Sequence, residues 1–183
     1  MTTFAIEPGP VADAYGRACQ HLDSAGVADS LWSENLDMWP SDQKVRGVIA
    51  NRLGWLRALD AVEPELARMR AFVDDVRRDG YERVLLMGMG GSSLAPEVVR
   101  RVLGVAQGFP RFLMTDTVNP DAVRARFADS ARTLFVIASK SGTTIEPSAL
   151  AAHAKLVASS TGSWSKSAVA ITDPDTALHR QAR

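Results

Sequence analysis

The sequence predicts an α/β fold, in which an open parallel sheet flanked by helices follows an α-helical N-terminal region. From about residue 81 onward, short runs that are apolar on nearly every residue alternate with longer amphipathic runs. Strands of that kind are buried on both faces, as in a parallel sheet covered by helices. Before residue 80, apolar residues recur instead at helical spacing. We therefore divide the chain into an α-helical segment, 1–80, and a sheet domain, 81–183.

The N-terminal segment is expected to contain three helices. Apolar residues spaced by three or four predict helices over 11–26, 45–59 and 66–80, the first and last of which end at a glycine. Three tryptophans in this segment are interpreted as packing anchors against the next layer rather than as a binding surface, because large aromatic rings contribute most when buried. They are Trp32, Trp39 and Trp55.

The sheet domain is expected to contain four strands, at 84–87, 112–114, 134–138 and 168–171. The helices between them are predicted to start near Pro96, Asp121 and Pro147, and another helix begins after the fourth strand. In open α/β sheets, ligands bind beyond the carboxyl ends of the strands. The polar residues that follow the second and fourth strands are interpreted mainly as turn and N-cap chemistry. They are Thr115-Asp116-Thr117 and Thr172-Asp173-Pro174.

Composition and charge narrow the partners that this chain can have. Its 183 residues are 46% hydrophobic and carry 21 basic and 21 acidic side chains, which suits a globular domain with an appendage and gives no sign of general nucleic-acid binding. The single cysteine, Cys19, excludes an internal disulfide and fits a reducing compartment. No apolar stretch approaches the roughly 18 residues of a membrane span, and the N-terminus lacks a secretory signal. We expect a cytoplasmic protein that binds neither nucleic acid nor membrane.

Two loops rich in glycine and hydroxyl groups give the strongest functional signal. Residues 88–93 (GMGGSS) and 139–144 (SKSGTT) each follow an apolar strand and open a helical run. The first amides of a helix have no internal acceptor, and glycine lets the backbone approach a ligand closely, so such a turn offers several donors to an anion. Hydroxyl groups add donors that can rotate. The pair of loops predicts an anion-binding site.

Both loops repeat one spacing of hydroxyl and proline. Ser93 is followed three residues later by Pro96, and Thr144 by Pro147. If Ser93 and Thr144 are N-caps, each proline falls in the first helical turn, where its missing N–H costs nothing. A capping box that begins at Thr143 is the alternative for the second loop, but it would place Pro147 where a helical N–H is required. Two roles stay open for the Thr144 hydroxyl, which could either cap the helix or bind a ligand.

Known nucleotide and hydrolase motifs do not fit these loops. The dinucleotide motif G-x-G-x-x-G requires glycine at Ser93, and the P-loop requires a lysine that neither loop supplies at that position. The nucleophile elbow G-x-S-x-G is approached by 91–95, with alanine in the last place, which would make Ser93 a nucleophile. His153 and His179 lie within a helical run and near the C-terminus, where they do not complete a triad. We expect no nicotinamide or other cofactor, and no metal.

The same residues resemble the phosphoglucose isomerase family. Residues 88–96 (GMGGSSLAP) are similar to the first signature of that family, and residues 139–146 (SKSGTTIE) are similar to its second, both within the sugar isomerase (SIS) domain. Leu31-Trp32 and residues 51–56 (NRLGWL) resemble the branch found in bacterial phosphoglucose isomerases and in transaldolase fusions. The resemblance runs from roughly residue 30 to the end of the chain, and its second motif is the more specific. It implies a flavodoxin-like three-layer SIS fold.

The resemblance also implies a reaction and a set of binding residues. The reaction interconverts glucose 6-phosphate and fructose 6-phosphate through an enediolate, without a cofactor, in a protein that is a homodimer at full length. Glu146 is expected to support a catalytic neighbour electrostatically rather than to act as the base. Lys140 has the alternative role of a solvated loop charge. The sugar-phosphate site would be lined by Gly91 and Ser92, and the phosphate would be wrapped by Ser139, Lys140, Ser141, Gly142, Thr143 and Thr144.

Departures from the family pattern limit the activity that we expect. Many members carry aspartate in place of Ser93 and a bulkier residue in place of Gly142, which indicates a divergent branch. Isomerisation needs a general base and acid groups. The resemblance assigns the glutamate base, the ring-opening histidine and a late lysine to a second SIS domain beyond Arg183, so no catalytic residue is assigned within the chain. We expect an N-terminal part, or a truncated reading frame, of an isomerase that binds phosphate without isomerising it.

Two other interpretations stay open. One is a non-enzymatic SIS module that senses a sugar phosphate, and the other is a structural partner that completes its sheet and site with a second chain. A DNA-binding helix-turn-helix in the N-terminal segment would favour the sensor, but the basic residues there are scattered among acidic ones.

Overall fold

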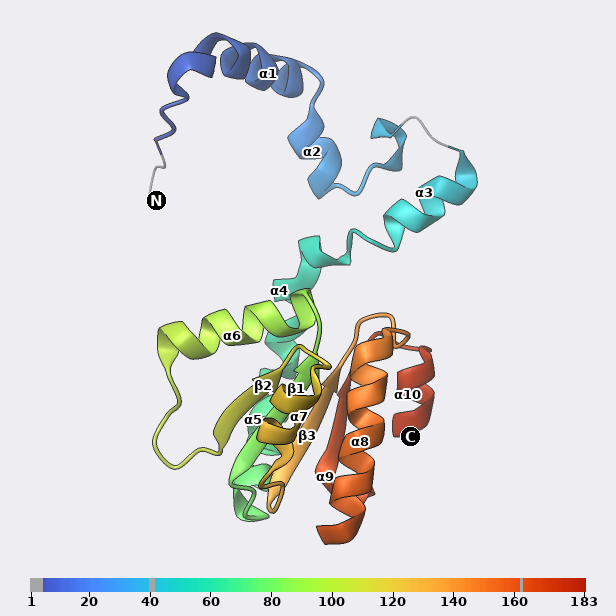
Figure 1. Ribbon diagram of the computed structural model, residues 1–183. Coiled ribbons are helices and arrows are strands. Elements are labelled where there is room, and N and C mark those ends of the chain that lie inside the picture. The colour runs from blue at the N-terminus through green and yellow to red at the C-terminus, as the bar shows by residue number, and fades with distance from the viewer. Residues whose placement is uncertain (1–4, 40–41, 162) are drawn as a thin grey trace. The chain divides into compact units, whose positions relative to one another are not determined.

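The computed structural model describes residues 5–39, 42–161 and 163–183, and it divides into two compact units, Met1–Ala67 and Arg68–Arg183 (Figure 1). The first unit is helical, and the second contains a sheet. The dividing point lies in the first turn of α5 (Leu66–Arg78), the helix that the sequence predicts over 66–80. Nearly all of α5 therefore belongs to the compact unit that holds the sheet.

Short helices joined by tight turns make up the first unit. The helix predicted over 11–26 is observed as α1 (Ala12–Ser24). The helix predicted over 45–59 is wrong, because α3 ends at Ala50 and the 3-10 turn η3 follows. The amides of Arg52 and Leu53 bond to carbonyls three residues back, which tightens the backbone out of the α-helical path. The other elements are η1 (Gly9–Val11), α2 (Val27–Trp32), η2 (Leu36–Met38), α3 (Gln43–Ala50), η3 (Gly54–Arg57), α4 (Ala58–Val62) and η4 (Glu63–Glu65).

Two of the tryptophans in the first unit are exposed. The side chains of Trp32 and Trp55 are 55% and 63% exposed. Trp39 is half-buried. Neither the Trp32 ring nor the Trp55 ring is therefore buried within the first unit, and packing of the tryptophans against the next layer stays a prediction.

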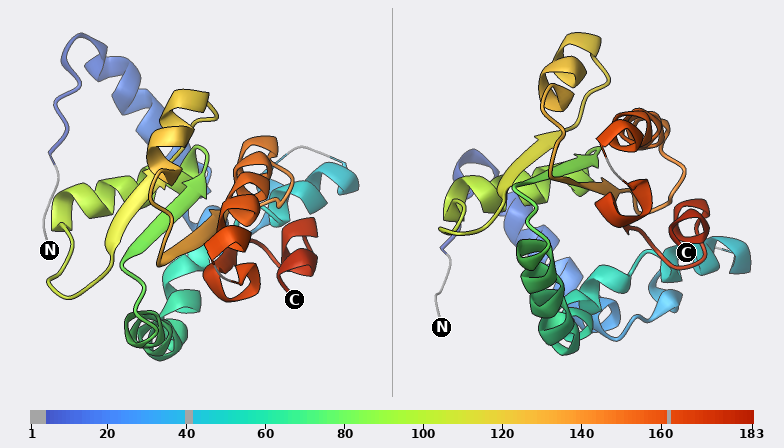
Figure 2. Two further views of the ribbon diagram at one scale, coloured as in Figure 1. Left: turned by 60° about the horizontal axis from the view of Figure 1, so that its bottom comes forward. Right: turned by 90° about the horizontal axis from the view of Figure 1, so that it is seen from below.

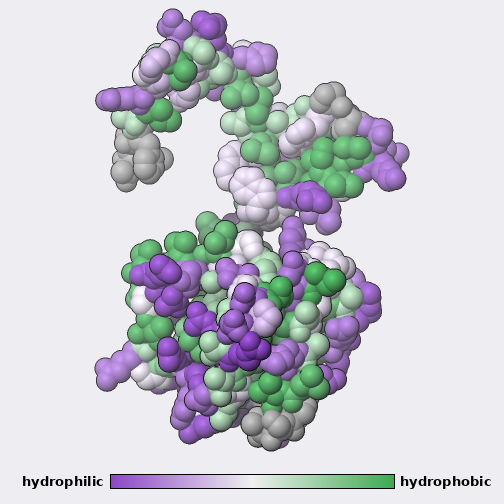
Figure 3. Space-filling view, viewed as in Figure 1, coloured by the Kyte–Doolittle hydropathy of each residue, from purple (hydrophilic) through white to green (hydrophobic). Residues whose placement is uncertain are grey.

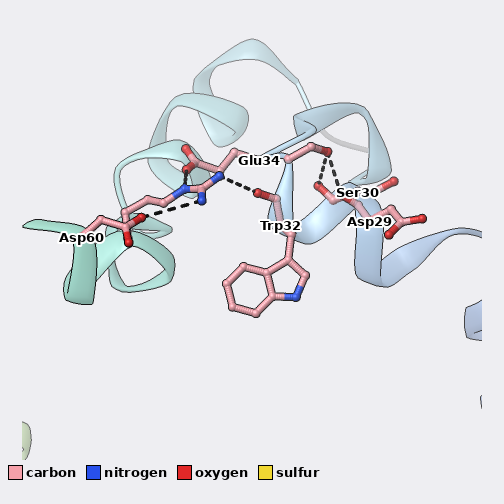
Figure 4. Close-up of polar contacts among 7 residues, drawn as sticks. Asp29, Ser30, Trp32, Glu34 and Asp60 are labelled. Carbon is pink, nitrogen blue, oxygen red and sulfur yellow. Dashed lines mark hydrogen bonds and ion pairs between the residues drawn. The ribbon is translucent and has the colours of Figure 1, made fainter.

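Arg57 joins the two stretches of the first unit that carry the family resemblance. Its guanidinium donates a hydrogen bond to the main-chain carbonyl of Trp32 at 3.0 Å and forms ion pairs with Glu34 at 3.5 Å and Asp60 at 3.9 Å (Figure 4). Glu34 has a positive φ of 54°, so the chain turns sharply after α2. The contacts of Arg57 hold this turn beside η3.

The second unit contains a four-stranded sheet in which each pair of neighbouring strands is parallel, as the sequence predicts. The strand order is β2-β1-β3-β4, and Gly88 at the end of β1 is in register with Ala138 at the end of β3. The α/β fold class is thereby confirmed. The strands are β1 (Arg83–Gly88), β2 (Arg111–Thr115), β3 (Thr133–Ala138) and β4 (Ala168–Ile171).

Helices cover both faces of the sheet and give three layers (Figure 2). Leu85 of β1 belongs to one apolar core and its neighbour Leu86 to the other, because successive side chains of a strand point to opposite faces. Val76 of α5 packs into the Leu86 core. Every residue of β3 is buried, as the continuous apolar run of this strand predicts. The Leu85 core receives side chains from α7 (Pro120–Phe127), α8 (Ile145–Thr161), α9 (Trp164–Ser167) and α10 (Ala177–Ala182).

Helix α6 (Gly91–Leu103) starts earlier than the sequence predicts. Its N-cap is Gly90, with φ 56° and ψ −123°. Ser93 is therefore not a cap: it lies inside the helix, is 1% exposed, and donates its hydroxyl to the carbonyl of Gly90 at 3.0 Å. The predicted start near Pro96 is wrong because the glycine turn opens the helix by itself. Pro96 lies within α6, where it has no N–H to offer to the carbonyl of Ser92.

A row of apolar side chains on α6 is left uncovered by the rest of the second unit. Leu94, Val98 and Val102 stand four residues apart on this helix, and each is more than half exposed (Figure 3). The helix contacts β1 and β2. A contiguous exposed apolar row of this kind is typical of a contact surface or of an aggregation-prone one.

Helices α7 and α8 begin close to their predicted positions. The N-cap of α7 is Asn119, whose side chain accepts hydrogen bonds from the amides of Asp121 and Ala122. Helix α8 begins at Ile145, so Thr144 directly precedes it and Pro147 falls in its first turn. This start agrees with Thr144, rather than Thr143, as the residue that opens the helix.

Candidate functional site

The two glycine- and hydroxyl-rich loops start side by side at the carboxyl edge of the sheet. One follows β1 and the other follows β3, which are adjacent strands with Gly88 opposite Ala138. The loops therefore start about 5 Å apart, the spacing of paired strands. The chain passes from β1 to β2 on one side and from β3 to β4 on the other, so the loops lie where the strand order reverses. In doubly wound sheets this switch point is where ligands bind.

The first loop presents backbone amides. Gly90 turns the chain into α6, and Gly91 and Ser92 are the first two residues of that helix. Within the described ranges, the amides of Gly90 and Gly91 have no protein acceptor, and both residues are exposed. The amide of Ser92 instead donates to the carbonyl of Met89 at 3.1 Å. Two free N–H groups at the positive end of a helix dipole form a suitable surface for an anion.

The second loop is held at both ends through Ser139, which is 5% exposed. The Ser139 amide donates to the carbonyl of Ile171 at 3.0 Å and so extends the pairing of β3 with β4. Its hydroxyl donates to the hydroxyl of Thr144 at 3.2 Å, and its carbonyl accepts from the amide of Gly142 at 3.1 Å. Ser139 therefore braces the loop against the sheet and against the start of α8.

The tip of the second loop exposes hydroxyl groups and amides. The hydroxyls of Ser141 and Thr143 lie 2.9 Å apart, and the Thr143 amide donates to Ser141 Oγ at 3.3 Å. Both side chains are exposed. In the part of the chain that the structure describes, the amides of Ser141 and Thr144 have no protein acceptor. Rotatable hydroxyls and free amides are the donors that phosphate oxygens accept.

Gly142 allows the second loop to pack closely on the turn before α10. It has a φ of +66°, and a Cβ placed there would lie 2.8 Å from the Cβ of Thr176 and 3.1 Å from that of Leu178. Any other residue would be strained and would collide with this turn. The glycine that departs from the family pattern is therefore a requirement of the packing seen here.

Lys140 and Glu146 carry the charges of the second loop and the first turn of α8. The Lys140 side chain is exposed, while its carbonyl accepts hydrogen bonds from the Asp173 amide at 3.1 Å and the Thr172 hydroxyl at 3.3 Å. Glu146 is half-buried in the first turn of α8, where the helix dipole favours a carboxylate. The positive charge of Lys140 and the negative charge of Glu146 cancel. The attraction of this loop for an anion therefore depends on its oriented amides.

Sequence reasoning missed the contact between the second loop and the turn that joins β4 to α10. The sequence indicates turn chemistry for Thr172, yet its hydroxyl bonds to a carbonyl 32 residues away in the chain. The sequence feature that could have indicated this contact is the position of Thr172 at the carboxyl end of β4, the strand beside β3.

A cavity of about 550 Å³ between α8 and α10 was also not predicted. It borders the second loop at Ser139 and Gly142, and Trp164 and Leu178 supply part of its apolar wall. Residues of four separate elements form it, so no local pattern could have revealed it.

Both histidines of the second unit, His153 and His179, make contacts through their rings. The ring of His153 packs edge-on against Phe127, with centroids 4.8 Å apart, and Nδ1 of His179 accepts the amide of Asp175 at 2.9 Å. Across the described ranges, no cluster of three or more His, Cys, Asp or Glu side chains could hold a metal ion. Across the same ranges, no helix has the length and apolar character needed to cross a membrane.

Comparison with known proteins places both loops within one family. The phosphoglucose isomerase family model matches residues 56–178. A glucose-6-phosphate isomerase from a Synechococcus species is 31% identical over 151 residues, which is 70% of this chain and 28% of that protein. The glucose-6-phosphate isomerase of Parasynechococcus marenigrum is 34% identical over 162 residues, covering 79% of this chain and 29% of that protein.

A solved structure shares the fold. The crystal structure of a glucose-6-phosphate isomerase from Chlamydia trachomatis matches with a TM-score of 0.60 and 22% identity, over 84% of this chain and 29% of that chain. The present chain thus spans less than a third of the length of each of these relatives. Its parallel sheet between helical layers is the SIS-like three-layer fold that the resemblance implies. Because the family model covers more than half of the sequence, including both loops, this chain belongs to the phosphoglucose isomerase family.

Proposed function

We propose that this chain supplies the phosphate-holding part of a glucose-6-phosphate isomerase, which interconverts glucose 6-phosphate and fructose 6-phosphate. One observation carries the proposal: two loops with free amides lie together at the switch point of the sheet, on the fold of this family. The relatives that match are named glucose-6-phosphate isomerases.

The two loops would contact different parts of the substrate. The amides of Gly90 and Gly91, with Ser92 beside them, would face the sugar phosphate from the start of α6. The second loop, residues 139–144, would wrap the phosphate with the hydroxyls of Ser141 and Thr143 and the free amides at its tip. Lys140 would add a screened positive charge from the surface.

Holding the phosphate fixes the far end of the substrate and so orients the reacting carbons. The reaction moves one proton from C2 to C1 of the open-chain sugar, and the hydroxyl and carbonyl exchange places through an enediolate. No electron leaves the substrate, so no redox cofactor is needed. A general base must carry the proton. Glu146 is half-buried in the first turn of α8, where we propose that it supports the site rather than acting as that base.

Calorimetric titration with 6-phosphogluconate and with inorganic phosphate tests the binding role. We expect saturable binding by the 183-residue chain, and we expect the double variant Ser141→Ala/Thr143→Ala to weaken it about tenfold, the cost of roughly one charge-assisted hydrogen bond. Ser165→Ala is the matched control, because Ser163 and Ser165 form another exposed hydroxyl pair at 2.9 Å, at the start of α9. Absence of heat at millimolar ligand would contradict the proposal.

A coupled assay with fructose 6-phosphate tests the second part of the proposal, that the 183-residue chain binds sugar phosphate without isomerising it. We expect no turnover above the uncatalysed rate. Turnover at the rate of an intact isomerase would show that the chain holds its own base, and Glu146→Gln would then identify whether that base is Glu146.

We further propose that the parent protein is a cytoplasmic homodimer that binds no nucleic acid. The single cysteine supports the cytoplasmic setting, the balanced charge supports the absence of nucleic-acid binding, and the homodimer is what the family resemblance implies. Light scattering after size-exclusion chromatography measures the oligomeric state. A filter-binding assay with duplex DNA tests whether the protein binds nucleic acid.

A further inference from the structure

The turn between β4 and α10, residues 172–176, holds the backbone of the second loop in place. The Asp173 amide donates to the Lys140 carbonyl at 3.1 Å, and the Thr172 hydroxyl donates to the same oxygen at 3.3 Å. The Ser139 amide is already bonded to the last residue of β4. One carbonyl of the loop is thus fixed by two donors that come from a distant part of the chain.

The two threonine hydroxyls of this turn are linked to each other and to the start of α10. The His179 amide donates to Thr176 Oγ1 at 3.0 Å, and Thr176 Oγ1 lies 2.9 Å from Thr172 Oγ1. A threonine hydroxyl has one proton to donate. Either hydroxyl can donate in the contact between Thr172 and Thr176, and when Thr172 donates to the Lys140 carbonyl, Thr176 donates to Thr172. Each donor in this hydroxyl chain strengthens the next, and the hydroxyl chain ends on the second loop.

Fixing the Lys140 carbonyl also fixes the amide that follows it. In a planar trans peptide, the C=O of one residue and the N–H of the next point in opposite directions. Because the Lys140 carbonyl faces the β4–α10 turn, the Ser141 N–H faces away from it. That N–H is one of the amides with no protein acceptor in the described ranges. The turn therefore presents the Ser141 amide to the surface of the loop.

We propose that Thr172 and Thr176 are positioning residues for phosphate binding, a role that rests on the proposed function of the second loop. Their hydroxyl chain holds the peptide between Lys140 and Ser141 in the orientation that aims the Ser141 amide at the anion. Thr176 also packs against Gly142. The turn therefore fixes the position of the loop tip as well as the orientation of the peptide between Lys140 and Ser141.

Substitution of Thr172 tests this role. Thr172→Val keeps the shape of the side chain and removes its hydroxyl. We expect the dissociation constant for 6-phosphogluconate to rise severalfold, and the ligand-induced shift of the Ser141 amide in proton–nitrogen NMR spectra to become smaller, because only the Asp173 amide then holds the Lys140 carbonyl. Thr172→Ser restores the hydroxyl and should restore both. Thr133→Val is the control, because the Thr133 hydroxyl bonds to the Ala131 carbonyl at 3.4 Å at the opposite end of β3.

The outcomes separate this inference from the function on which it rests. If the wild-type chain binds and Thr172→Val binds equally well with the Ser141 shift intact, the positioning role is wrong while the phosphate site stands. If the wild-type chain binds neither 6-phosphogluconate nor inorganic phosphate, the proposed function itself fails. Should Thr172→Val not fold, Thr172→Ala offers the same readouts, and wild-type affinity in that variant would equally overturn the positioning role.

Discussion

The hydroxyl of Ser139 donates a hydrogen bond to the hydroxyl of Thr144 across 3.2 Å, which joins the residue after β3 to the residue before α8. Ser139 is nearly inaccessible to solvent, whereas Thr144 is half-buried. The loop between them is therefore closed by its own side chains. A preformed loop binds with a smaller loss of conformational entropy.

Breaking this closure should loosen the loop. Ser139→Ala removes the donor, and we expect an unfolding free energy lower by about 1 kcal/mol together with weaker binding of 6-phosphogluconate. Urea unfolding and calorimetry measure the two effects. In a double-mutant cycle with Thr144→Val, we expect a coupling energy of about 1 kcal/mol between the two positions. Additive effects would show that the hydrogen bond does not hold the loop.

Gly142 should tolerate no side chain. Gly142→Ala combines a positive φ with a Cβ placed 2.8 Å from that of Thr176, and we expect the unfolding free energy to fall by about 2 kcal/mol or more, with loss of phosphate binding. Gly108→Ala is the control, since Gly108 also has a positive φ but its added Cβ meets only the end of the Arg77 side chain at 3.6 Å. Equal destabilisation by both substitutions would mean that strain alone, and not the contact with Thr176, requires glycine at 142.

Glu97 of α6 should titrate far below the usual range. Hydrogen bonds from Arg100 and then Arg101 lower the pKa of Glu97 from 4.5 to about 2. A lowered pKa in the folded state means that this ion pair stabilises the helix above the unfolded pKa and loses that contribution as the pH falls from 4.5 to about 2. A carbon NMR titration should give a midpoint near this value. Arg100→Gln should raise the midpoint more than Arg101→Gln, and a wild-type midpoint above about 4 would contradict the contacts seen here.

Arg57 should control the local order of the first unit. Arg57→Ala removes the donor to the Trp32 carbonyl and the ion pairs to Glu34 and Asp60. These groups are largely exposed, so we expect a cost of only about 1 kcal/mol or less. Hydrogen exchange of the amides in 29–35 should become faster, while exchange in the sheet stays the same. Arg17→Ala, at an exposed position of α1, is the control, and an equal effect of both would argue against a specific clamp.

The strands could be predicted because their signal is local. The β3 run is apolar at almost every position, and a strand of that kind must be covered on both faces. The start of α6 could not be predicted in the same way, because two local signals competed. The Ser93–Pro96 spacing favoured a later cap, but the positive φ of Gly90 opened the helix first, and the Ser93 hydroxyl then bonded back to the Gly90 carbonyl.

In the candidate site too, local features could be predicted and long-range contacts could not. The donors of the loops were visible in the sequence, since glycine, serine and threonine at a strand-to-helix turn have few other uses in combination. The residues that hold those donors were not visible. Thr172 reaches the Lys140 carbonyl only because β4 pairs with β3, and the fit of Gly142 to Thr176 depends on where α10 begins.

The sequence by itself determined the fold class, the order of the strands along the chain and the chemistry of the two loops, because side-chain periodicity and helix-start chemistry act over a few neighbouring residues. Only the tertiary structure decided that β1 and β3 are adjacent, that the loops therefore share one edge, and that the turn after β4 fixes the peptide between Lys140 and Ser141. These relationships join residues more than 30 positions apart, and packing of the whole sheet, rather than any local preference, brings them within hydrogen-bonding distance.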